Sequence, residues 1–226
     1  MKKASSALLL LILVIGLLVS CNNELPDNET ESLIGTKGQA GGIIVFDKGE
    51  YSDGWRFLEA APHFIVYKSN VPTIESTFSK DYENLYFGFY DFAGEDNTII
   101  CTPNASIGAG KENTDLLVAG IGDKSAVTKP GTNYTTKNYC AKACADLVVE
   151  HDGVTYDDWF LPSIEELKHY ELVYYSNDNN VLSNLYSAKI ASSSTIDEDS
   201  IWCLQSDWAT KASREDGFLV LPFRRY

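Results

Sequence analysis

Basic side chains are scarce in this chain of 226 residues. Only 18 lysines and arginines stand against 32 aspartates and glutamates, which gives a formal net charge of −14. Binding to a nucleic acid depends on Lys and Arg that neutralise phosphates, so this balance argues against a nucleic-acid partner. It also argues against a main role in binding sulfated polyanions or anionic lipid headgroups. Glycine and proline, at 16 and 7, are too few for a collagen-like or low-complexity chain.

Common catalytic motifs are missing as well. The sequence holds no GxSxG, HExxH or GxxxxGK[ST] motif. The stretch Gly108-Ala109-Gly110-Lys111 resembles a phosphate loop only faintly, because the glycine spacing is wrong and no Ser or Thr follows the lysine. We therefore expect a protein that is not an enzyme and that needs no cofactor or metal.

The N-terminal apolar run is too short to cross a membrane as a helix. It extends from Ala7 to Val19, whereas a transmembrane helix needs about 20 apolar residues. Together with the basic start Met1-Lys2-Lys3, it predicts a signal peptide over residues 1–20. The run ends in Leu18-Val19-Ser20-Cys21, which resembles a bacterial lipobox. The sequence thus predicts a lipoprotein whose lipid anchor, including a palmitate-type acyl chain, is attached to Cys21. The alternative is an ordinary secretory signal in which Cys21 is incidental.

Lipidation of Cys21 sets the expected domain organisation. Residues 21–32 carry four acids and no base, which is typical of a flexible acidic tether. Residues 33–226 are expected to form a single domain. The chain would then be held at a membrane of the bacterial cell envelope, and Asn22 after the cysteine favours the outer membrane.

Four cysteines remain after Cys21, and an exported chain lies in a compartment that permits disulfides. Cys101, Cys140, Cys144 and Cys203 allow three pairings, and we expect one or two disulfides among them. A zinc site on Cys140 and Cys144 is the alternative. It lacks a second close pair of Cys or His ligands.

The periodicity of the sequence predicts a mixture of strands and helices in one domain. The expected strands are Ile43–Phe46 and Trp55–Ala60, joined as a hairpin with a long tip, and later Ile201–Gln205 and Gly217–Phe223, joined by the polar loop Asp207–Asp216. The expected helices are Asn138–Glu150 and Ile164–Tyr175. The segment between Pro62 and Pro103 is irregular and aromatic, with Tyr82, Tyr86, Phe87, Phe89, Tyr90 and Phe92 interpreted as core covered by loops.

The second helix begins with a capping box. The Ser163 hydroxyl is expected to accept a hydrogen bond from the Glu166 amide, while the Glu166 side chain reaches back to the Ser163 amide. Adjacent Glu165 and Glu166 are therefore interpreted as first-turn acids that favour the helix dipole, and not as a catalytic pair.

Several segments in the same order resemble one family. Gly41–Pro62, Ile107–Val118, Ala141–Leu147, Asp157–Leu167 (DDWFLPSIEEL) and Val220–Tyr226 resemble domains related to the C-terminal domain of the Legionella collagen-like protein. This resemblance implies an α+β, C-type-lectin-like fold of the formylglycine-generating-enzyme type. In it, a small twisted antiparallel sheet is flanked by two helices, and the first and last strands lie close together.

The same resemblance bears on activity. Related oxidases hold copper with two cysteines close together late in the chain, whereas only Cys203 lies there, so oxidase activity is not expected. Calcium-dependent sugar binding is not expected either, because EPN-like and WND-like elements are absent. The chain also departs from the family at Ile190-Ala191 and at Leu221.

These observations favour a non-catalytic binding module for a protein or glycan ligand. The alternative is a structural envelope protein that acts through self-association or partner docking. The candidate ligand-binding residues are in or near the late polar loop, where Trp and Arg are the residue types most enriched in binding hot spots. They are Trp202, Asp207, Trp208, Lys211 and Arg214. The C-terminal pair Arg224-Arg225 is interpreted as bridging neighbouring carboxylates.

Overall fold

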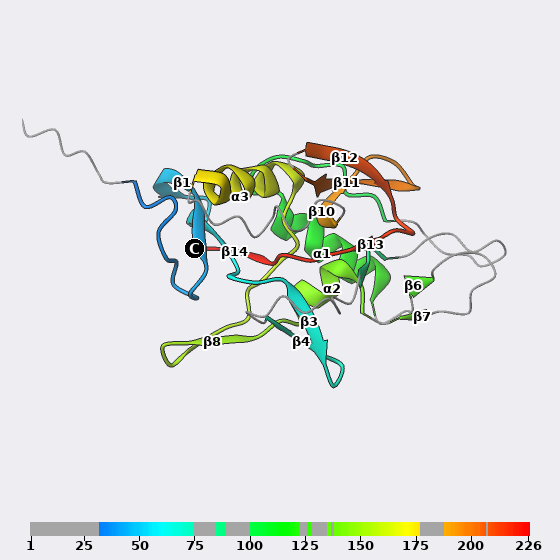
Figure 1. The fold of residues 1–226 in the computed structure, drawn as a ribbon, viewed down its shortest axis with the longest axis horizontal. Coiled ribbons are helices and arrows are strands. Elements are labelled where there is room, and N and C mark those ends of the chain that lie inside the picture. Colours follow the sequence, from blue (N-terminus) through cyan, green and yellow to red (C-terminus); the bar gives the residue numbers. More distant parts are fainter. Residues whose placement is uncertain are drawn as a thin grey trace, which may run out of the picture. The chain divides into compact units, whose positions relative to one another are not determined.

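The fold was analysed in a computed structural model that describes residues 32–74, 85–88, 100–122, 126–127, 135–136, 138–176, 188–206 and 208–226. Over these residues the chain is mixed α+β, as predicted, with three helices and several small antiparallel sheets. Residues 1–31, with Cys21, lie outside the described part. Contacts group Leu33–Tyr226 in one compact unit (Figure 1).

The first sheet joins the start of this unit to its end. Strand β1 (Ile43–Ser52) pairs antiparallel with β2 (Trp55–Ala60), and β2 pairs with the last strand, β14 (Phe223–Arg225). The β1–β2 hairpin was predicted, but its tip is only Asp53-Gly54, where both residues have positive φ. Such an Asp-Gly pair suits the tight turn that matches the twist of two strands. The remainder of the predicted long tip belongs to β1.

The second sheet corrects the prediction for the late polar loop. It has the order β10 (Lys189–Thr195), β11 (Ser200–Gln205), β12 (Trp208–Ser213). The predicted strand Ile201–Gln205 is confirmed as β11, whereas most of the predicted loop forms β12. The sequence of β12 contains small and polar residues, so its alternation of buried and exposed positions is weak as a strand signal.

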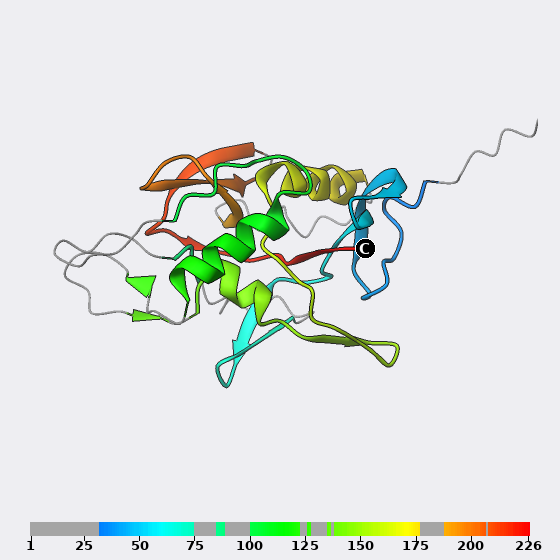
Figure 2. The same ribbon diagram turned by 180° about the vertical axis from the view of Figure 1, so that it is seen from behind.

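The remaining strands form two-stranded pairs. β3 (Ile65–Lys68) pairs with β4 (Val71–Ile74) and β8 (Val149–His151) with β9 (Val154–Tyr156), and both hairpins extend from the same side of the unit (Figures 1 and 2). β5 (Leu85–Tyr86) pairs with β13 (Gly217–Phe218), and β6 (Ala126–Val127) with β7 (Thr135–Thr136). The predicted strand Gly217–Phe223 is thus divided between β13 and the start of β14.

Two of the three helices were predicted, and one differs in length. α3 (Ile164–Ser176) begins at the predicted residue. α2 spans only Cys140–Ala145, because the chain leaves the helix there and enters β8 at Val149. Cys140, Ala143 and Cys144 of α2 are fully buried, and so is Leu147, which follows the helix.

The third helix, α1 (Gly110–Ile121), was not predicted. Its buried positions follow the helical spacing i, i+3, i+4, i+7 and i+11, but the buried residues at i+3 and i+4 are the polar Asn113 and Thr114. Their side chains bond to nearby chain: Thr114 Oγ1 accepts from the Leu161 amide at 2.9 Å, and Asn113 Nδ2 donates to the Asn104 carbonyl at 2.7 Å. Polar residues on the buried face erase the apolar periodicity from which a helix is predicted.

Apolar side chains gather in two buried clusters. One includes Trp159, Phe87 and α2, and the other packs α3 against the first sheet through residues such as Leu167 and Phe223. Of the predicted aromatic cluster, Phe87 is fully buried and Tyr86 is half-buried, while Tyr82, Phe89, Tyr90 and Phe92 lie outside the described residues.

The cysteines differ from the prediction of disulfides. Cys101, Cys140, Cys144 and Cys203 are all free thiols, and only Cys101 is exposed. Cys140 and Cys144 are one turn apart on α2, within the core. Nowhere in the described ranges does a group of three or more His, Cys, Asp or Glu residues form a candidate metal site. Among the described helices, none combines the length and apolar character needed to cross a membrane.

Candidate functional site: a polar pocket beside Trp55

A buried carboxylate fixes one wall of the candidate site. The predicted capping box of α3 is confirmed, since the Ser163 amide donates to Glu166 Oε2 at 2.6 Å and the Glu166 amide donates to Ser163 Oγ at 3.3 Å. Glu166 Oε1 also accepts from the Gly108 amide at 2.9 Å, and Glu166 Oε2 lies directly against Gly110. Glu166 thus ties the start of α3 to the loop that enters α1.

This arrangement argues against phosphate binding by the Gly108-Ala109-Gly110-Lys111 stretch. The amide of Gly108, which a phosphate would need, already bonds to the carboxylate of Glu166, and this carboxylate also lies against Gly110. A phosphate at this position would lie beside the carboxyl group of Glu166, which is fully buried and occupies the place of the anion. The loop therefore acts as a structural junction, and its outer surface lines a pocket.

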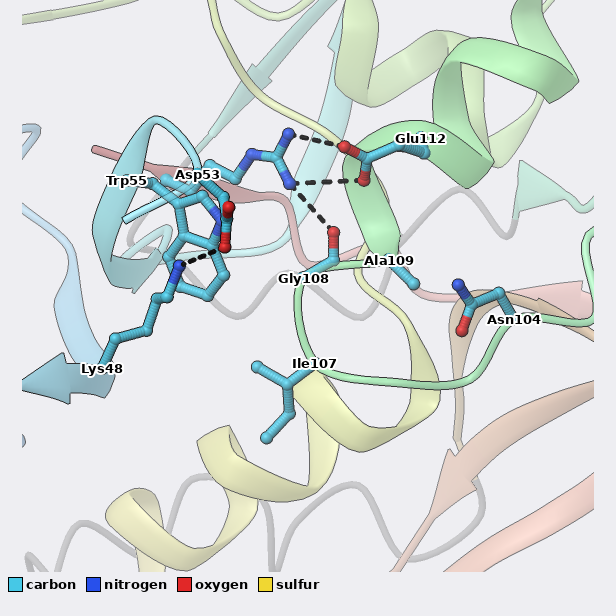
Figure 3. A pocket seen from close by; sticks show the side chains of 9 residues that line it. Lys48, Asp53, Trp55, Asn104, Ile107, Gly108, Ala109 and Glu112 are labelled. Atoms are coloured by element: carbon cyan, nitrogen blue, oxygen red, sulfur yellow. Dashed lines mark hydrogen bonds and ion pairs between the residues drawn. The ribbon is translucent and has the colours of Figure 1, made fainter. Parts of the chain in front are cut away.

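The pocket, called the Trp55 pocket below, has a volume of about 440 Å³. Figure 3 shows Lys48, Asp53 and Trp55 from the β1–β2 hairpin on one side, and residues from the α1 entry loop and first helical turn on the other. The full lining is Lys48, Asp53, Trp55, Asn104, Ile107, Gly108, Ala109, Glu112 and Arg225.

Close approach of two elements shapes this pocket. Gly108 has φ +88°, and a Cβ atom there would lie 3.1 Å from Cζ2 of Trp55. A side chain at residue 108 would therefore be strained in backbone and crowded against the indole. Glycine lets the α1 entry loop lie directly on Trp55, which is itself only 6% exposed.

The charges around the pocket are paired with one another. Arg225 Nη2 lies 2.7 Å from Glu112 Oε1, and Arg225 Nη1 donates to the Gly108 carbonyl at 2.9 Å. Lys48 Nζ lies 3.4 Å from Asp53 Oδ2 and 4.3 Å from the centre of the Trp55 ring. Two cations and two carboxylates thus leave the lining close to neutral.

Glu112 remains a carboxylate at neutral pH. Burial acts to raise its pKa, but the hydrogen bonds from Arg225 and from its own backbone amide outweigh burial, so the pKa of Glu112 is lowered. Asn104 adds an amide group that points toward the pocket (Figure 3) and whose Oδ1 accepts from the Ser106 amide at 3.1 Å. The pocket therefore offers hydrogen-bond donors, acceptors and apolar surface together.

The ionisable side chains among the described residues of the lining are Lys48, Asp53, Glu112 and Arg225. Its carboxylates are bound to cations, and Lys48 also donates to the Ser52 carbonyl at 2.7 Å. These groups can hold a polar ligand by hydrogen bonds.

The residues predicted to bind a ligand do not form one site. Trp208 is 76% exposed at the start of β12, and Lys211 is exposed with its Nζ 3.0 Å from Asp197 Oδ2. Arg214 is only 1% exposed, which corrects its assignment as a contact residue. Asp207 lies outside the described residues.

The two tryptophans of this set lie on opposite faces of the sheet. Trp202 is opposite Lys211 and Trp208 is opposite Gln205 across the β11–β12 pair. Positions 202 and 205 differ by an odd number, so their side chains point to opposite faces. Trp202, at 36% exposure, and Trp208 cannot form one aromatic platform. A loop predicted over Asp207–Asp216 has no such alternation, and β12 is what gives these side chains their two faces.

The interpretation of Arg224 and Arg225 is confirmed. Arg224 lies between Glu59, at 3.2 Å from Nη1, and Asp158, at 2.9 Å from Nε. Arg225 pairs with Glu112 as described above. Arg225 thereby lines the Trp55 pocket, a role that its sequence position in the last strand did not indicate.

No protein-family model, curated protein or solved structure matches this chain. The pocket is therefore interpreted from its own residues.

The buried Glu166 predicts a pH dependence of stability. Burial raises its pKa from 4.5 to about 7, against the lowering effect of the amides that bond to it. The folded protein binds this proton more tightly than the unfolded chain, so the stabilisation is complete below the unfolded pKa and is lost as the pH rises through 7. The stability advantage of wild type over Glu166→Gln should shrink by about 3 kcal/mol between pH ~4.5 and ~8.

Urea titrations of both proteins over that pH range measure this difference. Glu165→Gln is the matched control, because Glu165 is the half-exposed neighbour in the same helical turn. A wild-type advantage that stays constant with pH would show that Glu166 does not titrate in this range.

Proposed function

We propose that this protein is a lipid-anchored, non-catalytic binding module of the bacterial envelope, and that a neutral saccharide unit binds in the Trp55 pocket. One observation carries the proposal. The pocket contains hydrogen-bond donors, hydrogen-bond acceptors and apolar surface, and its charged side chains are already paired with one another. The membrane anchor is the predicted lipid on Cys21.

The ligand class follows from this lining. A sugar hydroxyl both donates and accepts, so it is matched by the carboxylates of Asp53 and Glu112 and by the amide of Asn104. Ile107, with the small exposed parts of Ala109 and Trp55, supplies the apolar contact that the C–H face of a sugar ring prefers. An anionic ligand is less suitable, because the cations that would attract it are held by carboxylates of the pocket.

The finer description of the fold belongs to the same proposal. We propose a C-type-lectin-like fold of the formylglycine-generating-enzyme type. The pairing of β14 with β2, next to β1, supports it, because this fold brings the first and last strands together. The presence of α1 as a third helix is a departure from the expected pair of flanking helices.

An array of neutral and sulfated glycans, probed with the full chain in detergent micelles, tests the proposal. Wild type, Asn104→Ala, Glu112→Gln and Trp208→Ala are applied in parallel. We expect wild type and Trp208→Ala to retain the same neutral glycans, and each pocket variant to bind them about tenfold more weakly, because one hydrogen-bonding group is lost.

Other results on this array have definite meanings. Binding that is lost in Trp208→Ala and retained in the pocket variants would place recognition on the β11–β12 hairpin. Binding only to sulfated glycans that disappears with added salt would indicate unspecific charge attraction. The absence of any hit at high protein concentration would contradict a glycan ligand.

A second function is favoured by Trp208 itself. At 76% exposure it is the most exposed large apolar side chain among the described residues. Exposed Trp is typical of protein-binding hot spots. Docking of a protein partner, or self-association, at the β11–β12 hairpin is therefore the alternative, and a change of oligomeric mass in Trp208→Ala measures it.

A further inference from the structure

Arg214 is a buried cation without a carboxylate partner in the described part of the chain. Its side chain enters the interior at the end of β12 and is 1% exposed. Nη2 donates to the carbonyls of Ile100, at 2.9 Å, and Asp197, at 3.4 Å. Nε and Nη1 are both buried and have no hydrogen-bond partner among the residues that the structure describes.

Such a group is expensive in free energy, because a buried charge needs an opposite charge and a hydrogen bond for each donor. Burial lowers the pKa of Arg214, as desolvation outweighs the neighbouring negative charges. Asp197 and Asp199 act on the guanidinium only through space, and the Asp197 carboxylate bonds instead to Ser200 and Lys211. The ring of Phe87, 5.1 Å from Cζ, offers only a weak cation–π contact.

One ionisable side chain does contact this guanidinium. Sγ of Cys101 lies 3.7 Å from Arg214 Nη2. Cys101 is exposed, whereas Cys140, Cys144 and Cys203 are fully buried. Burial raises the pKa of Cys203 to about 11 and that of Cys140 still further, so both thiols stay protonated and inert at neutral pH.

We propose that Cys101 is an oxidation site at which peroxide forms a cysteine sulfinate, and that Arg214 holds the anion. A sulfinate oxygen extends from sulfur toward the guanidinium. It would replace the long sulfur contact by a charge-assisted hydrogen bond of ordinary length. Oxidation thus supplies the negative charge that the buried arginine lacks. The site lies outside the Trp55 pocket and does not depend on the ligand proposed there.

The chemistry balances in two equal steps, each with one molecule of hydrogen peroxide. In the first, sulfur attacks a peroxide oxygen, the O–O bond breaks and an S–O bond forms. Sulfur loses two electrons, and the thiol proton leaves with the second oxygen as water. The second step repeats this on the sulfenic acid and gives the sulfinic acid, which ionises by releasing its proton to solvent.

Peptide mapping by mass spectrometry tests the site. The full chain in detergent micelles is treated with hydrogen peroxide, digested and compared with untreated protein. We expect two added oxygen atoms on the peptide of Cys101 and none on the peptides of Cys140, Cys144 and Cys203. Oxidation of these three cysteines without Cys101 would overturn the proposal.

The role of Arg214 is tested by thermal unfolding. We expect the melting temperature of the oxidised protein to rise by about 4 °C over that of the reduced protein, and Cys101→Ser to show no such response. Cys101→Asp places a carboxylate beside Arg214 without any oxidation, and its melting temperature should exceed that of the matched neutral variant, Cys101→Asn, by a similar amount.

These variants leave Arg214 in place, so the test does not depend on a substitution in the core. Equal melting temperatures of Cys101→Asp and Cys101→Asn, or a lower melting temperature after oxidation, would show that Arg214 does not hold an anion at this position. Either result overturns the proposal.

Discussion

Glu166→Ala is expected to lower the free energy of unfolding by about 3–5 kcal/mol. The substitution leaves the fully buried amide of Ser163 and the half-buried amide of Gly108 without their acceptor. Each buried, unsatisfied amide costs about 1–3 kcal/mol, and the α3 cap is lost as well. Urea unfolding followed by tryptophan fluorescence measures the change.

The control for this prediction is the neighbouring acid. Glu165 is half-exposed and pairs only with Lys168, at 2.7 Å. Glu165→Ala should change stability by less than about 0.5 kcal/mol. Similar losses in the two variants would contradict the account in which the Glu166 carboxylate joins the α1 entry loop to α3.

Glu59→Ala is expected to cost a comparable amount, about 3–5 kcal/mol, for a different reason. Glu59 is fully buried and accepts from the amides of Ala40 and Gly42, at 3.0 and 2.8 Å, and from Arg224. Removing its carboxylate leaves the buried Arg224 with Asp158 alone and two buried amides without an acceptor. Thermal and urea unfolding both measure this loss.

Glu112→Ala is the matched control on the same pair of C-terminal arginines. It removes the partner of Arg225, but its side chain is 59% exposed, so water replaces the lost hydrogen bonds. We expect a loss below about 1 kcal/mol. If Glu59→Ala lowered the free energy of unfolding as little as Glu112→Ala does, the contacts of Glu59 with Arg224 would not be what holds β14 on β2.

The fold class and the capping box were predictable because their signals are local. Ser163 and Glu166 stand three residues apart before an apolar run, and the two hydrogen bonds of the box formed as expected. The β1–β2 hairpin was predictable for the same reason, since the apolar runs Ile43–Phe46 and Trp55–Ala60 flank a short polar segment, although its tip is shorter than predicted.

The misses have a common physical cause, which is that buried positions hold polar or small residues. β10 runs through buried serines whose hydroxyls bond to backbone carbonyls, as Ser192 Oγ does to Trp202 at 2.6 Å. α1 buries Asn113 and Thr114 in a similar way. Buried polar groups that find their hydrogen-bond partners far along the chain leave no periodic pattern in the sequence.

The Trp55 pocket was equally hidden. Its residues come from β1–β2, from the α1 entry loop and from β14, which are separated by long stretches of chain. Trp208 is exposed, but residue type alone could not show that Arg214 points inward and that Trp202 lies on the opposite face of the sheet. The position of Arg214 depends on burial and that of Trp202 on the register of the strands, and both properties exist only in the folded chain.

Saturation-transfer NMR on the full chain in detergent micelles, with a mixture of neutral monosaccharides as the probe, is the most direct test of the Trp55 pocket. We predict transfer of saturation to ring protons of at least one sugar, its loss in Glu112→Gln and Asn104→Ala, and its retention in Trp208→Ala. Equal transfer in wild type and in both pocket variants, or no transfer at millimolar sugar, would contradict saccharide binding at this site.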